Sequence, residues 1–216
     1  MRRDQLYLEA YDLLYTRFGP QSWWPGETPF EVMVGAVLTQ NTNWSNVINA
    51  IDNLRQAGVL DYRSLSALPV DQLAEMIRPS GYYNLKAKRL HNLLSMIESS
   101  YDGDLQWFLE DDVWAARENL LNVKGVGPET ADSILLYACE KPAFVIDTYT
   151  HRVFSRHNLV DEETDYHTMQ EEFVNNLPTD TKLFNEYHAL IVVVAKEYCK
   201  KTNPLCQQCP LNGLNM

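Results

Sequence analysis

The sequence predicts an all-α fold made of many short helices. Apolar residues recur every three or four positions along almost the whole chain, as Leu6, Ala10, Leu13 and Leu14 show near its start. No stretch alternates apolar and polar residues over the length of a strand, and no segment repeats at the spacing of a solenoid. With 45% hydrophobic residues in a chain of 216, there is enough apolar material for one large core or two smaller ones.

Start signals and breakers place the individual helices. Pro29 and Pro128 suit a first helical turn, where the missing N–H costs no hydrogen bond, and Ser45 can cap the helix that follows it. Trp107 and Trp114 are expected in the core. In chain order, the predicted helices cover residues 4–18, 29–40, 45–56, 70–77, 85–99, 104–108, 112–121, 128–139, 148–157, 166–176 and 183–199.

The charge and the apolar segments of the chain argue against two kinds of protein, a nonspecific polyanion binder and a membrane protein. The formal net charge of −11 argues against nonspecific adhesion to a polyanion, but the acids concentrate in segments such as 110–112 and 161–165. The basic residues near the motifs described below are Lys86, Lys88, Arg89, Lys124, Arg152 and Arg156. The chain begins with no signal peptide, and no apolar run approaches the roughly 20 residues of a membrane span. We therefore expect a cytoplasmic protein with no membrane contact.

A pair of glycines marks the most informative segment, residues 121–131. Gly125, Val126 and Gly127 allow two helices to meet through a very tight turn, because glycine tolerates positive φ. Such a turn leaves N–H groups at the start of the second helix pointing outward, where they can bind a phosphate oxygen next to Lys124. Taken alone, a Gly-x-Gly sequence is also typical of an ordinary loop between packed helices.

An aspartate follows the apolar run at residues 143–146. Asp147 precedes Thr148 at a predicted helix start, and Arg152 lies one turn further on. A carboxylate at this position is stabilised by capping and by the helix dipole, so it stays ionised at neutral pH. Capping is the commoner role of such an aspartate, and a catalytic role is the alternative.

The hairpin and the aspartate together resemble the helix-hairpin-helix glycosylases of the endonuclease III superfamily, over nearly the full length of the chain. The resemblance implies two helical lobes, a barrel over residues 24–141 and a second lobe from 1–23 with 142–216. It also implies that Asp147 is catalytic. Bifunctional members carry a lysine nucleophile two residues after the second hairpin glycine, and this chain has Glu129 there.

Further residues are similar to the 3-methyladenine DNA glycosylase type III branch of that superfamily. The pattern consists of Trp23-Trp24-Pro25, residues 35–42, and residues 81–87, which resemble the loop that enters DNA opposite a flipped base. The resemblance implies that Gln40 and Tyr82 fill the vacated duplex. Trp23, Trp24, Pro25 and Trp44 are the candidate base pocket. Core packing is the alternative for these tryptophans.

These residue types suit hydrolysis of an N-glycosidic bond. Bond breakage creates an oxocarbenium-like sugar, which a fixed carboxylate stabilises, and the same carboxylate can orient or deprotonate the attacking water. An alkylated purine leaves without its positive charge and needs little acid catalysis, and electron-rich indoles attract a cationic base. Glu129 is a weaker catalytic candidate that could help to hold the base; a surface position on the helix is its other interpretation.

Three cysteines near the C-terminus match part of a metal motif. Cys199, Cys206 and Cys209 have the spacing of the superfamily's four-iron four-sulfur loop, but Asn215 stands where its fourth cysteine would be. A cluster with a different fourth ligand, a labile or partial cluster, and a loop without metal all remain open. Cys139 is expected to be buried and unpaired.

The sequence therefore predicts a monofunctional glycosylase that removes 3-methyladenine-like bases from double-stranded DNA in base excision repair and acts as a monomer. Two alternatives remain. One is a glycosylase of the endonuclease III type, with lyase activity, for uracil, mismatched thymine or oxidised pyrimidines. The other is a noncatalytic lesion-binding module, which the acidic charge favours.

Overall fold

The computed structural model describes residues 2–214 and confirms the all-α prediction, since no strand occurs among them. The chain divides into two compact units, one formed by Trp24–Lys141 and the other by the residues before and after that segment. Within residues 2–214, no helix combines the length and the apolar character that crossing a membrane requires.

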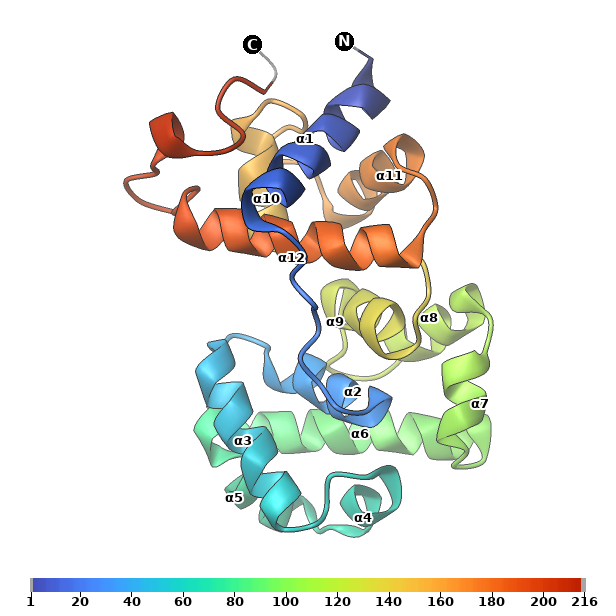
Figure 1. Ribbon diagram of the computed structural model, residues 1–216. Coiled ribbons are helices and arrows are strands. Elements are labelled where there is room, and N and C mark those ends of the chain that lie inside the picture. The colour runs from blue at the N-terminus through green and yellow to red at the C-terminus, as the bar shows by residue number, and fades with distance from the viewer. Residues whose placement is uncertain (1, 215–216) are drawn as a thin grey trace. The chain divides into compact units, whose positions relative to one another are not determined.

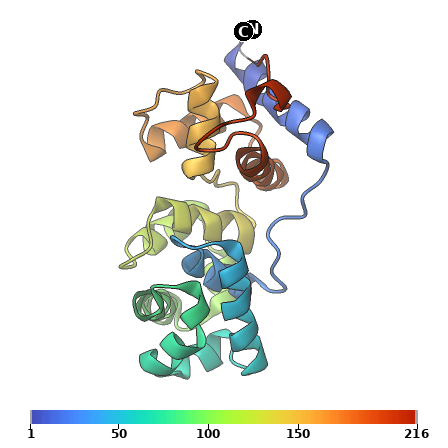
Figure 2. The same ribbon diagram turned by 90° about the vertical axis from the view of Figure 1, so that its left-hand side faces the viewer.

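The unit Trp24–Lys141 is organised around the long helix α6 (Tyr83–Tyr101), which contacts helices on several sides (Figure 1). Figure 2, where α6 is seen nearly end-on, shows the other helices of this unit around it. α2 is apolar almost throughout and buried from Phe30 to Leu38, because other elements surround it. The elements before α6 are α2 (Pro29–Leu38), α3 (Trp44–Gln56), α4 (Tyr62–Ala67), α5 (Val70–Met76) and the 3-10 turn η1 (Arg78–Ser80).

After α6 come α7 (Leu105–Glu110), α8 (Val113–Leu121), α9 (Pro128–Ser133) and the π-helical turn η2 (Ile134–Ala138). The prediction of one regular α-helix over 128–139 was therefore partly wrong. The N–H of Cys139 donates to the carbonyl of Ile134, five residues earlier, which widens the last turn. Arg117 on α8 forms a two-pronged ion pair with the fully buried Asp132 on α9, at 2.7 and 3.0 Å, and so fixes one side of the hairpin.

The second unit has an aromatic core. It contains α1 (Arg3–Phe18), α10 (Thr148–Arg156), α11 (Tyr166–Asn176), α12 (Thr181–Glu197) and the 3-10 turn η3 (Cys206–Gln208). Phe144, in the segment that leads into α10, stacks on Phe173 with ring centroids 4.1 Å apart. Tyr7 contacts both Phe154 and Phe173, so α1, α10 and α11 share one core. This packing fixes the start of α10.

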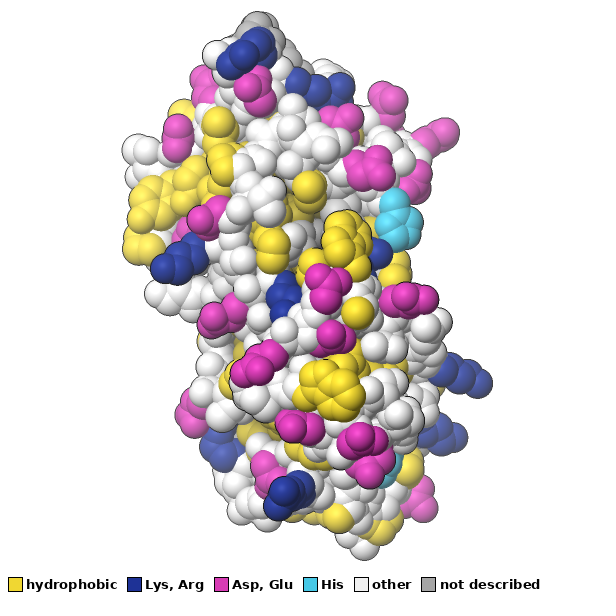
Figure 3. Space-filling view, turned by 90° about the vertical axis from the view of Figure 1, so that its right-hand side faces the viewer, with side chains coloured by type: hydrophobic (Ala, Val, Ile, Leu, Met, Phe, Trp, Pro, Cys, Tyr) yellow, Lys and Arg dark blue, Asp and Glu magenta, His cyan; other side chains and the backbone are white. Residues whose placement is uncertain are grey.

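Several local predictions were wrong. Ser45 does not cap α3; Asn43 is the cap, and its side chain accepts the N–H of Asn46 at 3.0 Å and the hydroxyl of Ser45 at 2.7 Å. Trp107 and Trp114 are 50% and 75% exposed rather than in the core. Figure 3, which faces the side of α7, shows hydrophobic side chains at the surface with acidic ones around them.

Candidate active site

Asp147 is the N-cap of α10, as the sequence predicted. Its Oδ1 accepts the backbone N–H of Thr150 at 2.7 Å and the hydroxyl of the same residue at 2.9 Å. These bonds fix one carboxylate oxygen, and the positive end of the helix dipole favours the charged form. The second oxygen, Oδ2, is thereby oriented away from the cap.

His188 on α12 faces this second oxygen. Its Nε2 lies 3.5 Å from Oδ2 of Asp147, and the two side chains are only 7% and 11% exposed. Burial alone raises the pKa of the Asp147 carboxyl, but hydrogen bonding and charge from His188, with the bonds from Thr150, outweigh it and lower the pKa. Sequence reasoning missed His188. The only available signal was a polar residue on the buried face of an amphipathic helix.

The hairpin predicted at Gly125–Gly127 joins α8 to α9. Gly125 has φ +99°, and a Cβ there would lie 2.5 Å from Cγ of Arg89, so only glycine fits without displacement. Gly127 is the N-cap of α9 with φ −100°, and a Cβ there would meet nothing within 4 Å. Val126 is buried between them and anchors the turn, while Lys124 is exposed.

Gln40 connects this hairpin with the loop after α2. Its Nε2 donates to the carbonyl of Gly125 at 3.1 Å and to Oγ1 of Thr130 at 2.9 Å, and Arg89 donates to its Oε1. The side chain of Gln40 is thus held by groups on α6, on the hairpin and on α9. The sequence analysis expected Gln40 to enter DNA, through the family resemblance, and did not predict these contacts with the hairpin.

Tyr82, the other residue expected to enter DNA, is 70% exposed and has φ +47°. This left-handed conformation is uncommon for a residue with a side chain. It follows Gly81, which has φ +65°, so two successive residues make the sharp turn into α6. The turn presents the phenol ring to solvent.

Three of the basic residues expected near DNA make hydrogen bonds within the protein. Lys86 is buried. Nε of Arg152 donates to the carbonyl of Cys199 at 2.7 Å, and Arg156 donates to the carbonyl of Lys200 at 2.7 Å. Arg152 and Arg156 therefore hold the segment that follows α12.

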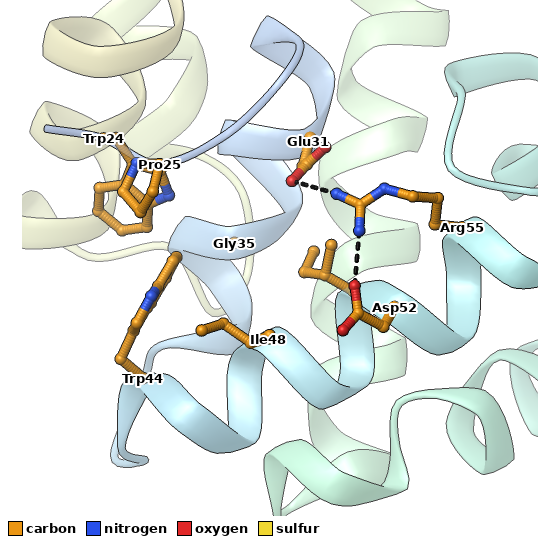
Figure 4. A pocket seen from close by; sticks show the side chains of 9 residues that line it. Trp24, Pro25, Glu31, Gly35, Trp44, Ile48, Asp52 and Arg55 are labelled. Atoms are coloured by element: carbon orange, nitrogen blue, oxygen red, sulfur yellow. Dashed lines mark hydrogen bonds and ion pairs between the residues drawn. The ribbon is translucent and has the colours of Figure 1, made fainter. Parts of the chain in front are cut away.

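A small pocket of about 100 Å³ lies in the unit Trp24–Lys141. Trp24, Pro25 and Trp44 line one side of it, and Figure 4 shows the two indole rings opposite a group of charged side chains. The rings of Trp24 and Trp44 meet edge to face at 5.2 Å. Gly35 makes room for Trp24, because a Cβ at Gly35 would lie 3.3 Å from Nε1 of the indole. Trp23, also predicted for this pocket, is half-exposed and belongs to the other unit.

The charged group of the pocket was not predicted. Glu31 is buried in α2 and accepts a bond from Arg55 at 2.9 Å, and Arg55 also pairs with Asp52 at 2.6 Å (Figure 4). A glutamate within an otherwise apolar helix was the available signal, but its partner is 24 residues away. Glu129, the weaker catalytic candidate, is exposed in the first turn of α9.

The cysteine residues do not fit a metal site in the part of the chain that the structure describes. No group of three or more ligand side chains suited to a metal ion occurs there, and Asn215 lies outside the described residues. Cys199 is buried and its Sγ accepts from Arg156 at 3.3 Å, whereas Cys206 is exposed. Burial raises the pKa of the Cys209 thiol. Cys139 is buried and unpaired, as predicted.

Comparison with known proteins assigns the chain to a family. Residues 34–179 match the model of the HhH-GPD superfamily of base excision DNA repair proteins. A protein of Methanocaldococcus jannaschii, provisionally named a DNA repair glycosylase, is 45% identical over 96% of this chain and 94% of its own length. Endonuclease III of Thermotoga maritima is 32% identical over 86% of this chain and 81% of its own.

Solved structures agree with this assignment. The 3-methyladenine DNA glycosylase of H. pylori, solved with 1,N6-ethenoadenine, superposes with a TM-score of 0.75 at 30% identity, over 91% of this chain and 98% of that one. An endonuclease III–DNA complex superposes with a TM-score of 0.82 at 23% identity, over 99% of this chain and 95% of that one, and shows the shared fold. The chain therefore belongs to the HhH-GPD superfamily of base excision DNA repair proteins and is a DNA glycosylase.

Proposed function

We propose that this glycosylase is monofunctional and hydrolyses the N-glycosidic bond of alkylated purines, of the 3-methyladenine kind, in double-stranded DNA. Asp147 is the catalytic residue. The observation that carries the proposal is its buried carboxylate, which Thr150 and His188 hold in the charged form. A carboxylate that is ionised and rigid before substrate arrives costs no reorganisation during the reaction.

The reaction follows from this carboxylate. As the bond between base and sugar breaks, positive charge develops at the anomeric carbon, and Asp147 stabilises it. The same carboxylate orients a water molecule and accepts its proton as the new C–O bond forms. Alkylation at a ring nitrogen makes the base cationic, so it leaves as a neutral molecule and needs no strong general acid.

Trp24 and Trp44 support the choice of a cationic base. Stacking of a base on an aromatic side chain contributes roughly 1–3 kcal/mol, and a positive charge over the ring adds cation–π attraction. The same pocket is lined by two carboxylates, those of Glu31 and Asp52, and by the one guanidinium of Arg55 that pairs with both. The related protein of H. pylori is a 3-methyladenine DNA glycosylase, which supports the same substrate class here.

Glu129 supports the absence of lyase activity. A Schiff base requires an amine, and a carboxylate cannot form one. At the position where bifunctional relatives are expected to carry lysine, this chain has an exposed glutamate on α9. Lys86 has an amine but is only 1% exposed.

The second candidate is a glycosylase for uracil, mismatched thymine or oxidised pyrimidines. It is favoured by the relatives named endonuclease III and by a thymine-DNA glycosylase of Aeropyrum pernix, 26% identical over 89% of this chain. The sequence of the hairpin is compatible with either substrate class.

A panel of lesions tests the proposal. Single-turnover base release would be measured on methylated duplex DNA and on matched duplexes with 1,N6-ethenoadenine, uracil, thymine opposite guanine, or an oxidised pyrimidine. Release of alkylated adenine, with no strand cleavage and no borohydride-trapped complex, is expected. Faster release of a pyrimidine would support the second candidate. A trapped complex would show that an amine elsewhere in the chain acts as the nucleophile, although position 129 carries a glutamate.

A further inference from the structure

Lys86 is a buried cation in the first turns of α6. Its side chain is 1% exposed, and its Nζ donates to the carbonyl of Leu38 at 2.8 Å and to the carbonyl of Ser80 at 2.6 Å. Burying an ammonium group is costly, and a hydrophobic residue of similar volume is often at least as stabilising in such a position. A stabilising role alone therefore does not account for a lysine here.

The two acceptors lie at equivalent places in the chain. Leu38 is the last residue of α2, and Ser80 is the last residue of η1. The final carbonyls of a helical segment lack partners within it, so both can accept a hydrogen bond from a cation, and the dipole of α2 adds to this attraction at Leu38. Gln40 lies two residues after Leu38, and Tyr82 lies two residues after Ser80. One ammonium group thus joins the starts of the two loops that carry these residues.

The loop of Gln40 is also tied to the hairpin. The amide of Gln40 donates to Gly125 and Thr130, and Arg89 binds its oxygen. Arg89 lies on α6, one turn after Lys86. The hairpin, the Gln40 loop and the Tyr82 turn are therefore connected through the first turns of α6.

The contacts of Lys86 also exclude a role as a hidden nucleophile. Burial lowers the pKa of Lys86 to about 8, a value that would suit an amine that attacks a sugar. Both of its described hydrogen bonds, however, go to main-chain carbonyls, and almost none of the side chain reaches the surface.

We propose that Lys86 is a positioning residue, which fixes the spacing between Gln40 and Tyr82 so that the two side chains enter the duplex together when a base is extruded. The proposal rests on the proposed function, which requires a base to be extruded from duplex DNA, and on the expectation from the family resemblance that Gln40 and Tyr82 fill the space it leaves. Lys86 itself touches neither the base nor the sugar.

Lys86→Met is the main variant, because methionine keeps an unbranched side chain of similar length and removes both hydrogen bonds. We expect single-turnover release from a paired lesion to fall roughly 10- to 100-fold, the effect of a displacement of about 1 Å. The same lesion in single-stranded DNA leaves no gap opposite a partner strand. Its release by the variant should therefore change less than about twofold. Circular dichroism and thermal unfolding verify that the variant is folded.

A double-mutant cycle separates positioning from general disruption. In a Gln40→Ala/Tyr82→Ala background, Lys86→Met should cause no further loss, because the side chains that it positions are gone. An equal loss in both backgrounds, an equal loss on single-stranded DNA, or no loss at all would overturn the proposal. If Lys86→Met does not fold, Gly81→Ala replaces it. Gly81 has φ +65° and open space around it, so the alanine strains the backbone and displaces the Tyr82 turn without a steric clash. Base release by this variant should again fall on double-stranded DNA and change little on single-stranded DNA.

Fluorescence of a 2-aminopurine next to the lesion reports extrusion without chemistry. If the wild type extrudes the base but releases none of the lesions, the proposed function is contradicted. If Lys86→Met then also fails to extrude the base, the positioning role is still supported. Normal extrusion and release by Lys86→Met, with active wild type, would contradict the positioning role alone.

Discussion

Nε2 of His188 and Oδ2 of Asp147 lie 3.5 Å apart, and both side chains are almost fully buried. The residues come from α12 and from the start of α10, and the aromatic core of Tyr7, Phe144 and Phe173 holds this part of the chain together. The pair explains how a carboxylate stays ionised in a buried position, because His188 and Thr150 offset the effect of burial on the Asp147 pKa.

His188→Phe should move the acid limb of the pH–rate profile to higher pH. The charge and hydrogen bond of His188 lower the pKa of Asp147, so their loss lets burial raise it, and the carboxylate becomes protonated at a higher pH. His188→Gln, which keeps an N–H donor, should shift the limb less. The measurement is single-turnover base release against pH, and an unmoved limb in folded His188→Phe would exclude this role of the histidine.

The two hairpin glycines should respond differently to alanine. Gly125→Ala is expected to lower the free energy of unfolding by about 1–3 kcal/mol, because φ is +99° and the new methyl group meets Arg89. Gly127→Ala should change it by less than about 0.5 kcal/mol, since its surroundings are open and φ is −100°.

The affinity for duplex DNA should also respond to alanine at position 127. A methyl group at position 127 would keep a phosphate away from the N-terminus of α9, so Gly127→Ala should weaken duplex binding about tenfold. Chemical denaturation and fluorescence anisotropy measure the two effects. Unchanged affinity of Gly127→Ala for DNA would contradict a phosphate contact at the hairpin.

Lys86 should make stability depend on pH in a defined direction. The pKa of Lys86 is about 8 in the folded chain and 10.5 for an exposed lysine, so between these pH values the unfolded state binds more protons. The free energy of unfolding of the wild type should therefore rise relative to Lys86→Met from about pH 8 to about pH 10, by up to about 1.4 kcal/mol per pH unit. Comparing two variants removes the contribution of the tyrosines. A difference that stays constant with pH would refute the burial of a charged lysine.

Substitution of Trp44 should slow the release of cationic bases more than the release of neutral ones. Trp44→Ala is expected to slow release of cationic alkylated bases roughly 10- to 100-fold, while Trp44→Phe, which keeps an aromatic face, retains most of the rate. Release of a neutral lesion should fall less in Trp44→Ala. Equal losses on cationic and neutral lesions would indicate that Trp44 acts only by packing against Trp24.

Local signals in the sequence predicted most of the helices and the cap at Asp147. Helical periodicity and first-turn prolines located α2, α6 and α11 to within two or three residues, because these signals lie inside the elements themselves. The six-residue helix α4 was missed because a segment that short carries little periodicity. Asn43 was passed over for Ser45, since both residues are good caps and only the backbone decides between them.

Pairs that are distant in the sequence could not be predicted. His188 with Asp147, Arg55 with Glu31 and Lys86 with Leu38 each join residues more than 20 positions apart, and no local pattern encodes such contacts. Burial was misjudged for the same reason. Trp114 is large and apolar, but it lies on an exposed side of α8 and remains 75% exposed.

Base release by Asp147→Asn on alkylated duplex DNA tests the central claim most directly. Asparagine is as good an N-cap as aspartate, so α10 and the fold should be preserved, and duplex binding should remain. Because the charge that stabilises the sugar cation is gone, single-turnover release should fall at least about 100-fold relative to the wild type. Release at the wild-type rate by the folded variant would contradict a catalytic role for Asp147 and leave it as a helix cap.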